Sequence, residues 1–392
     1  MQSIKLILML LAVSMTCTMY AQQIISQDEV DIKSYALYEK GSWKELLQYG
    51  KASTKSGQDF LLLRLRMAYA AFMLGNFSEA VIQYDQVLKQ DASNSTAHYY
   101  TWLCRKYLNQ TELSGASVKY LSSEAREEAK IKKVALSSAG TEVSHKTTNY
   151  EPRKDGLYAA VNVGLQLGWN VNMFQSVASF NQTIDERKFI YVTDSNNIAI
   201  NQKQYYNRTT INLNSKWQVK LAYHYLHTPF NNYSYNNHVG LLGIKYSGGY
   251  YDVQANAIFS KLTDTTRQQY DAIVNLYPFG NLNLYLFSTG SLRTYNGSAF
   301  TLKQVVGFKA MKNTWLEFNG TLGRFSNLIE NDALYIFNAI DQNTIKAGAT
   351  IYVNPSKHIV LHGGYTFEQR ETYKSSFLFN QHSITGGLTW KM

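Results

Sequence analysis

Histidine and serine side chains are the groups in this sequence that could carry out catalysis. A lipid-cleaving hydrolase needs a serine hydroxyl hydrogen-bonded to a histidine, with a third group that orients the imidazole. His382 and Ser383 are adjacent, but neighbouring residues of a strand point to opposite faces. The other histidines on predicted strands lack a serine at a suitable spacing: His224, His227, His238, His358 and His362. We therefore expect no enzyme. Without a cysteine–histidine cluster or a glycine-rich loop before a helix, we expect no metal and no cofactor.

The charged side chains point to electrostatic selection instead. The formal net charge is +10, and residues 151–392 hold 21 Lys and Arg against 14 Asp and Glu. The candidate lumen-lining residues on predicted polar strand faces are Lys220, Asp252, Asp271, Lys303, Lys309, Glu317, Lys346 and Glu368. Two interpretations stay open: a basic surplus that favours anionic solutes, or charges that pair across a polar interior. Nucleic acid is not an expected partner, because no basic cluster is dense enough.

The N-terminus has the features of a secretory signal peptide. Lys5 precedes an apolar block over residues 6–13, and Ala21 is a small residue suited to cleavage, so the signal covers residues 1–21. The block is too short to cross about 30 Å of hydrocarbon as an anchor. The residues before Cys17 do not suit lipid attachment. The exported chain then keeps Cys104 alone, which we expect to be a buried thiol.

Residues 28–134 have helical periodicity and an internal repeat. A glycine and an aromatic residue two positions on recur after 34 residues, and a glycine allows the tight turn between paired helices. The predicted repeat-packing residues are Gly41, Trp43, Gly75, Phe77, Ala80 and Tyr84. The period resembles that of the tetratricopeptide repeat, and a third, degraded copy without the turn glycine starts near residue 98. A generic bundle of helical hairpins is the alternative.

Residues 156–392 have a period of two, which indicates strands. Val219, Leu221 and Tyr223 alternate with Lys220 and His224, and similar segments of about ten residues follow. Such alternation is typical of membrane-spanning β-strands, with lipid on one face and water on the other. Apolar and aromatic residues make up 45% of the chain, which excludes intrinsic disorder. Residues 135–155 show little periodicity and are predicted to be a linker.

Twelve strands are predicted, beginning near residues 157, 206, 217, 236, 250, 267, 281, 299, 314, 343, 358 and 380. Five short connections alternate with six longer ones, the longest over residues 170–205, as in barrels with tight periplasmic turns and long outer loops. With a periplasmic helical domain, the first strand rises from the periplasm and an even number of strands returns the C-terminus there. Weaker alternation at 187–193 and 334–340 leaves the count open by two.

A signal peptide, a short repeat domain and a barrel ending in Gly386, Leu388 and Trp390 resemble the YaiO-type outer-membrane barrels, which are related in architecture to exopolysaccharide-export barrels. The resemblance implies an antiparallel up-and-down barrel in outer-membrane lipid, with its repeats in the periplasm. It also implies a pore or export conduit, for polysaccharide or another anionic solute, and a periplasmic protein bound by the repeats. A closed barrel that anchors an interaction module is the second interpretation, and a lipid hydrolase is the third. The closed barrel would be narrowed by inward-pointing tyrosines: Tyr158, Tyr277, Tyr285 and Tyr352.

Overall fold

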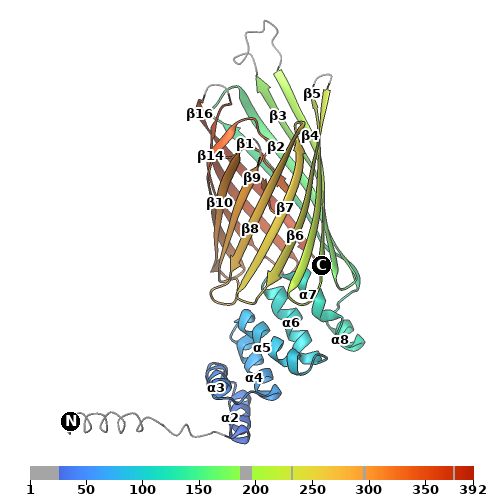
Figure 1. Cartoon of the computed structure of the whole chain (residues 1–392), viewed down its shortest axis with the longest axis vertical. Helices are drawn as coiled ribbons and strands as arrows, with labels where there is room; N and C mark the ends of the chain where they lie inside the picture. Colours follow the sequence, from blue (N-terminus) through green and yellow to red (C-terminus); the bar gives the residue numbers. More distant parts are fainter. Residues whose placement is uncertain (1–25, 186–196, 231–232, 295–296, 374–375) are drawn as a thin grey trace, which may run out of the picture.

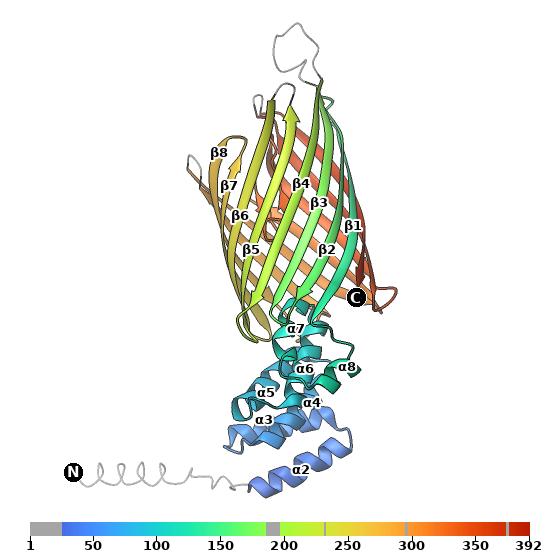
Figure 2. The same cartoon turned by 90° about the vertical axis from the view of Figure 1, so that its right-hand side faces the viewer.

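A computed structural model describes residues 26–185, 197–230, 233–294, 297–373 and 376–392, and every structural statement below refers to these residues. The predicted signal peptide at 1–21, Cys17 and the weak strand pattern at 187–193 lie outside them. Helices come first in the chain and lie at one end of a β-barrel, with α2 farthest from the barrel and α7 at its mouth (Figures 1 and 2).

The described residues form seven helices before the first strand. They are α2 (Gln27–Glu39), α3 (Trp43–Lys55), α4 (Leu61–Met73), α5 (Phe77–Gln90), α6 (Ser95–Tyr107), α7 (Thr111–Val118) and α8 (Ser123–Glu128). Side-chain caps fix several of their starts: Ser26 and Glu29 form a capping box on α2, and Asn76 accepts a hydrogen bond from the Glu79 amide on α5. Within the described residues, we find no helix with both the length and the apolar character needed to cross a bilayer.

Left-handed residues recur at the turns between paired helices. Gly41 separates α2 from α3 with a φ of 66°, and Gly75 separates α4 from α5 with a φ of 70°. The third turn, between α6 and α7, is made by Asn109 with a φ of 56°, again 34 residues after the previous one. Asparagine is among the few residues that tolerate this conformation. The degraded third copy therefore keeps the turn geometry without the glycine.

The predicted repeat-packing residues lie in one aromatic core. The Trp43 ring contacts the rings of Tyr38 and Tyr69 at centroid distances of 5.6 and 5.5 Å. Phe77 stacks on Tyr107 at 4.7 Å. Ala80 and Tyr84 are buried in the central cluster together with Cys104, which is a free thiol, as expected.

Fourteen strands of the described chain close into a single antiparallel barrel. They are β1 (Val134–Thr148), β2 (Arg153–Leu167), β3 (Val171–Asp185), β4 (Asn197–Asn212), β5 (Trp217–Phe230), β6 (Tyr233–Ser247), β7 (Tyr251–Leu262), β8 (Thr265–Leu276), β9 (Leu284–Thr294), β10 (Ser298–Met311), β11 (Thr314–Leu322), β14 (Gln342–Val353), β15 (Ile359–Glu371) and β16 (Leu378–Lys391). β1 pairs with β16 from Ser138 opposite Lys391 to Thr148 opposite Gln381, so no strand edge is left open. Closure satisfies the backbone groups that lipid could not bind.

The predicted strand count of twelve is wrong, because two strands were missed. Residues 135–155, predicted as a linker, form most of β1, so the barrel begins at Val134 and not at 156. The predicted long loop at 170–205 contains β3 and the first half of β4. The two missed strands, β1 and β3, are the neighbours of β2 in the chain. Because β1 comes first and leads away from the helices, β2 runs back toward them, whereas it was predicted to run away from them. Strands from β4 onward keep their predicted direction, and the C-terminus lies at the helical end (Figure 1).

The predicted alternation of short and long connections also fails. At the end away from the helices, β7 and β8 are joined by Thr263 and Asp264 alone. Both residues have positive φ angles, 49° and 60°, as in the tight hairpin turns that match strand twist. At the helical end, the connection from β8 to β9 spans residues 277–283.

The helices are attached to the barrel by polar contacts with its turns. Ser78 donates its amide proton to the Gly280 carbonyl at 3.0 Å and its hydroxyl proton to the Gly249 carbonyl at 2.8 Å. Lys216 pairs with Asp85 at 2.8 Å. These are three different turns, which join β4 to β5, β6 to β7 and β8 to β9, so the helical domain is held across one side of the barrel mouth.

Candidate functional site

The barrel separates an apolar outside from a polar inside. Along β7, Tyr251, Val253 and Phe259 face outward and are exposed, whereas Asp252 and Gln254 face inward and are buried. The same alternation exposes Leu242, Ile244, Leu292, Phe318, Ile351 and Ile384 on other strands. A closed sheet with an apolar exterior and a polar interior is the architecture of a membrane-spanning β-barrel.

Residues 323–341, which connect β11 to β14, fold back into the lumen. Within this segment, β12 (Ile329–Glu330) pairs with β13 (Tyr335–Ile336). Its apolar side chains Ile329 and Ala333 are buried against inward-facing residues of the barrel wall. Those wall residues are Tyr206, Ala222, Val239, Leu241, Ile258 and Leu262, from β4 to β7. The segment is hereafter called the lumen segment.

The acidic residues of the lumen segment bind basic residues of the wall. Lys220 Nζ lies 2.6 Å from Asp332 Oδ2, and Arg208 Nη1 lies 3.3 Å from the same oxygen. Lys303 and Lys346 each pair with one oxygen of Glu330, at 2.8 and 2.7 Å. Two wall strands thus hold each carboxylate.

A third acid fixes the end of the lumen segment. Arg153 pairs with Asp341 at 2.8 Å, and both side chains are buried. A buried ion pair that also makes hydrogen bonds fixes geometry even where its net stabilisation is small.

Helix α7 occupies the mouth of the barrel at the opposite end. The Glu112 carbonyl accepts hydrogen bonds from Asn172 and Asn212 at 3.0 and 2.6 Å. Gly115 lies so close to the Trp169 carbonyl that a Cβ atom would overlap it. Gln110, just before the helix, donates to Asp252 at 3.0 Å. The small residues of α7 therefore allow it to enter the mouth.

Arg208 on β4 joins the two closing elements. Its Nη2 atom lies 2.6 Å from Glu112 Oε1 on α7, and its Nη1 atom lies 3.3 Å from Asp332 in the lumen segment. Burial alone would raise the pKa of Glu112, but Arg208 and Lys220 outweigh it, and the net pKa is below its usual value. One guanidinium thus bridges an element from each end of the barrel. The sequence pattern of β4 did not identify Arg208 as a functional residue.

The structure brings the predicted lumen-lining charges into separate small networks. Lys220, Lys303 and Lys346 bind the lumen segment as described. Asp252 pairs with Lys245 at 3.0 Å, and Glu368 pairs with Arg370 at 3.0 Å. Most of these charges therefore meet a partner of opposite sign, as one of the two interpretations of the sequence expected.

The other three predicted residues contact polar or aromatic groups. Asp271 accepts a hydrogen bond from Gln269 at 2.8 Å, and Glu317 accepts one from Tyr285 at 2.8 Å. Lys309 is exposed at the helical end of β10, with its ammonium group 5.5 Å from the Trp315 ring. Gln269 also donates to the Ile329 carbonyl of the lumen segment at 2.6 Å, so Asp271 supports the segment through Gln269.

Four of the tyrosines expected to narrow the lumen make interior contacts. Tyr277 donates to Asp252 at 3.0 Å. The Tyr158 ring lies 6.5 Å from the ring of Tyr335 in the lumen segment. Tyr285 donates its hydroxyl proton to Glu317 at 2.8 Å, and the Tyr352 ring lies 6.0 Å from the His362 ring. Aromatic side chains therefore line the lumen beside its charged groups.

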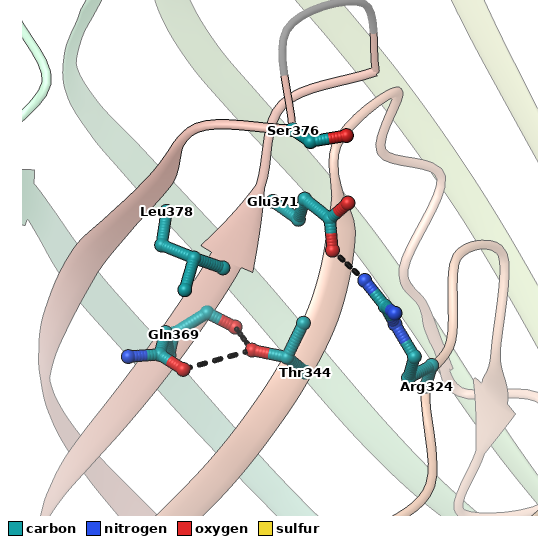
Figure 3. A pocket seen from close by; sticks show the side chains of 6 residues that line it. All are labelled: Arg324, Thr344, Gln369, Glu371, Ser376 and Leu378. Atoms are coloured by element: carbon teal, nitrogen blue, oxygen red, sulfur yellow. Dashed lines mark hydrogen bonds and ion pairs between the residues drawn. The ribbon is translucent and has the colours of Figure 1, made fainter.

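An open hollow of about 400 Å³ lies at the outer rim, where the lumen segment leaves the wall. Arg324 and Glu371 form an ion pair there, and Thr344 donates its hydroxyl proton to Gln369 at 3.1 Å (Figure 3). The ion pair ties the start of the lumen segment to β15.

His382 and Ser383 lie on opposite faces of β16, as their adjacency predicted. Ser383 is buried on the inward face, whereas His382 Nδ1 lies 2.7 Å from the Tyr365 hydroxyl, which is on the outward face. His362 faces inward, 3.5 Å from Glu142. His224 is buried, with Nδ1 2.8 Å from the Ala333 carbonyl of the lumen segment.

No protein-family model matches the chain, and no curated protein matches it. A bacterial polysaccharide outer membrane secretin is similar over 66% of this chain and 98% of its own, with 10% identity and a TM-score of 0.41. The Acinetobacter baumannii outer membrane protein Omp33 is similar over 66% and 99%, with 7% identity and a TM-score of 0.36. The translocator domain of the autotransporter NalP from Neisseria meningitidis is similar over 76% and 100%, with 11% identity and a TM-score of 0.37. Similarity at this level carries no functional conclusion.

Proposed function

We propose that this protein is an outer-membrane conduit whose lumen is closed by the lumen segment and by α7, with its helical domain in the periplasm. The apolar exterior supports insertion into a bilayer. The helical domain and the C-terminus are at the same end of the barrel, as an even number of strands requires (Figure 2).

The observation that carries this proposal is the way the lumen is filled. A barrel of this size encloses more space than its wall side chains can fill. The space is taken by two separate elements that meet at Arg208 through ion pairs. Ion pairs and hydrogen bonds of this kind can be exchanged for those of water or of a polar solute, whereas the apolar contacts of Ile329 and Ala333 with the wall would be lost. The polar contacts therefore allow the filling elements to leave.

The cargo we propose is a polysaccharide or a related oligosaccharide. Aromatic rings that line the lumen, such as Tyr158 and Tyr206, offer flat faces on which sugar rings can lie, beside hydrogen-bonding groups. The resemblance of the domain order to exopolysaccharide-export barrels supports the same cargo. The 34-residue spacing of left-handed turns supports tetratricopeptide-like repeats, whose stacked helices would bind a periplasmic protein.

The alternative function is a closed barrel that anchors the helical domain. It is favoured by one observation: α7 enters the mouth as part of the same domain that binds the turns, through Asn172 and Asn212. In that case the lumen segment would be a permanent filling.

Single-channel recording in planar bilayers separates the two functions. Two proteins are recorded: the wild type, and a shortened variant in which two glycines replace residues 327–340. The shortened variant keeps the Phe325–Asn343 pairing that closes the rim. A conduit predicts rare, small openings for the wild type and a steady conductance for the shortened variant. A folded shortened barrel that stays silent, with and without an additional deletion of α7, would refute the conduit and leave the anchor.

A further inference from the structure

We propose that Asp332 and Glu330 occupy two binding sites for acid groups of the transported solute, so that the lumen takes a carboxylate-bearing saccharide. The inference rests on the proposed conduit and names its substrate class. In this arrangement, the lumen segment closes the conduit by presenting side chains chemically similar to the solute.

The first site surrounds Asp332. One carboxylate oxygen is bound by Lys220 at 2.6 Å and Arg208 at 3.3 Å, and the other accepts a hydrogen bond from Gln254 at 2.6 Å. Lys220 and Gln254 are buried. Two cations and an amide donor around one carboxylate form a complete binding site for an acid group.

The second site surrounds Glu330. Lys303 and Lys346 hold one oxygen each, and Lys346 also lies over the Phe337 ring at 3.7 Å. For Lys303, the described residues contain no ion pair besides the one with Glu330. Removal of the lumen segment would leave Lys303 on β10 without its counter-charge, and Lys346 on β14 with Glu368 opposite it on β15. A partly buried, unpaired ammonium group is costly, so an anionic solute would be favoured beside Lys303.

The backbone that carries these acids is under strain. Asn331, Asp332 and Ala333 have φ angles of 53°, 55° and 70°, and none of the three is a glycine. A left-handed conformation is unfavourable for a residue with a side chain, less so for asparagine and aspartate. The ion pairs hold the turn in this conformation, and a solute that replaces the two carboxylates would release the strain.

Aromatic rings next to the first site fit a saccharide better than a small inorganic anion. Arg208 lies over the Phe174 ring at 5.7 Å, and the Tyr206 hydroxyl donates to the Asp332 carbonyl at 2.8 Å. When the lumen segment leaves, that hydroxyl and the Phe174 ring become available to the body of a sugar whose carboxylate binds Lys220.

The test uses the full-length protein with both acids replaced by their amides, Glu330→Gln and Asp332→Asn. The matched control is Asp264→Asn, since Asp264 is an exposed turn acid that pairs only with Lys261 among the described residues. The probes are trigalacturonate, which is anionic, and maltotriose, which is neutral. Binding is measured by calorimetry in detergent, and block of the current is measured in planar bilayers.

We expect the double variant to bind trigalacturonate at least about tenfold more tightly than the wild type or the control, because the sites are no longer filled by tightly held carboxylates. Maltotriose should not bind comparably. Adding Lys220→Gln or Lys303→Gln to the double variant should weaken trigalacturonate binding about tenfold for each lysine. Heat-modifiable migration in gels verifies that each variant is a folded barrel.

The inference is overturned if the folded double variant binds both probes equally, or binds trigalacturonate with no loss on Lys220→Gln and Lys303→Gln. Failure of the conduit itself gives a different result. In that case trigalacturonate would bind with the expected lysine dependence, but no variant would conduct.

Discussion

Substitution of Arg208 by glutamine should loosen both elements that close the lumen. Glutamine keeps part of the side-chain volume but removes the charge that faces Glu112 and Asp332. The substitution should lower two free energies: that of withdrawing α7 from the mouth and that of withdrawing the lumen segment. No other residue described contacts both elements in this way.

The expected magnitudes differ because the two pairs differ in exposure. The Glu112 side chain is 35% exposed, so its pair is worth about 1 kcal/mol, as for well-formed surface pairs. The Asp332 side chain is 10% exposed but keeps Lys220 and Gln254, so the loss is about 2 kcal/mol, below the cost of an unpaired buried charge. Release of α7 should increase about fivefold, and release of the lumen segment about 30-fold.

Thiol-modification rates measure both openings. Single cysteines replace Ser117 in α7 and Ala333 in the lumen segment, both of which are buried. Cys104 is the internal reference, because burial raises its pKa to about 12 and keeps it unreactive. Lys303→Gln is the matched control: Lys303 pairs with Glu330 of the lumen segment, so its loss should accelerate modification at position 333 alone. If Arg208→Gln accelerates thiol modification at position 333 but leaves the rate at position 117 unchanged, Arg208 does not bridge the two elements.

Three further results are expected. Tyr84→Phe should leave the stability of the helical domain unchanged or raise it, since the buried hydroxyl has no hydrogen-bond partner in the described residues; a melting temperature lowered by several degrees would contradict this. Burial lowers the pKa of His98, so the unfolded chain binds the proton more tightly and helical stability should fall as the pH drops below the ordinary histidine pKa of 6.5; thermal melts at pH 7.5 and 5.5 should show the loss, and His98→Gln should reduce it. Val177→Arg, in the middle of the outward face of β3, should cost about 2–4 kcal/mol in lipid vesicles, and Val134→Arg, at a strand end, about 0–1 kcal/mol; equal costs in urea unfolding would mean that no bilayer surrounds β3.

The sequence predicts a strand only where one of its two faces is clearly apolar. On β1, the outward residues include Thr141 and Thr147, and the inward ones are also small or polar, so no alternation is visible. On β3, Phe174 points inward while Gln175 points outward, which is the reverse of the expected pattern. Local composition cannot reveal such strands, because they are held by pairing with neighbours on both sides.

The predicted charges were placed on strands correctly in several cases, but their partners were not predictable. Lys220, Lys303 and Lys346 point into the lumen, yet the carboxylates they bind come from the connection between β11 and β14, which was predicted to be a loop outside the barrel. One signal was available: Leu328, Ile329 and Leu334 are more apolar than an outer loop in water requires. Arg208 had no local signal, since its role depends on two segments that approach it from opposite ends.

The position of the lumen segment along the chain has a consequence for biogenesis. Of the basic residues that bind its acids, Arg153, Arg208, Lys220 and Lys303 belong to strands that precede the segment, and Lys346 belongs to β14, which follows it. A sheet grown from the N-terminal side would already display most of the binding groups before its last three strands arrive. The segment can therefore settle against an open, curved sheet, and the final hairpins then seal the cylinder around it, so that nothing has to be threaded through a finished rim.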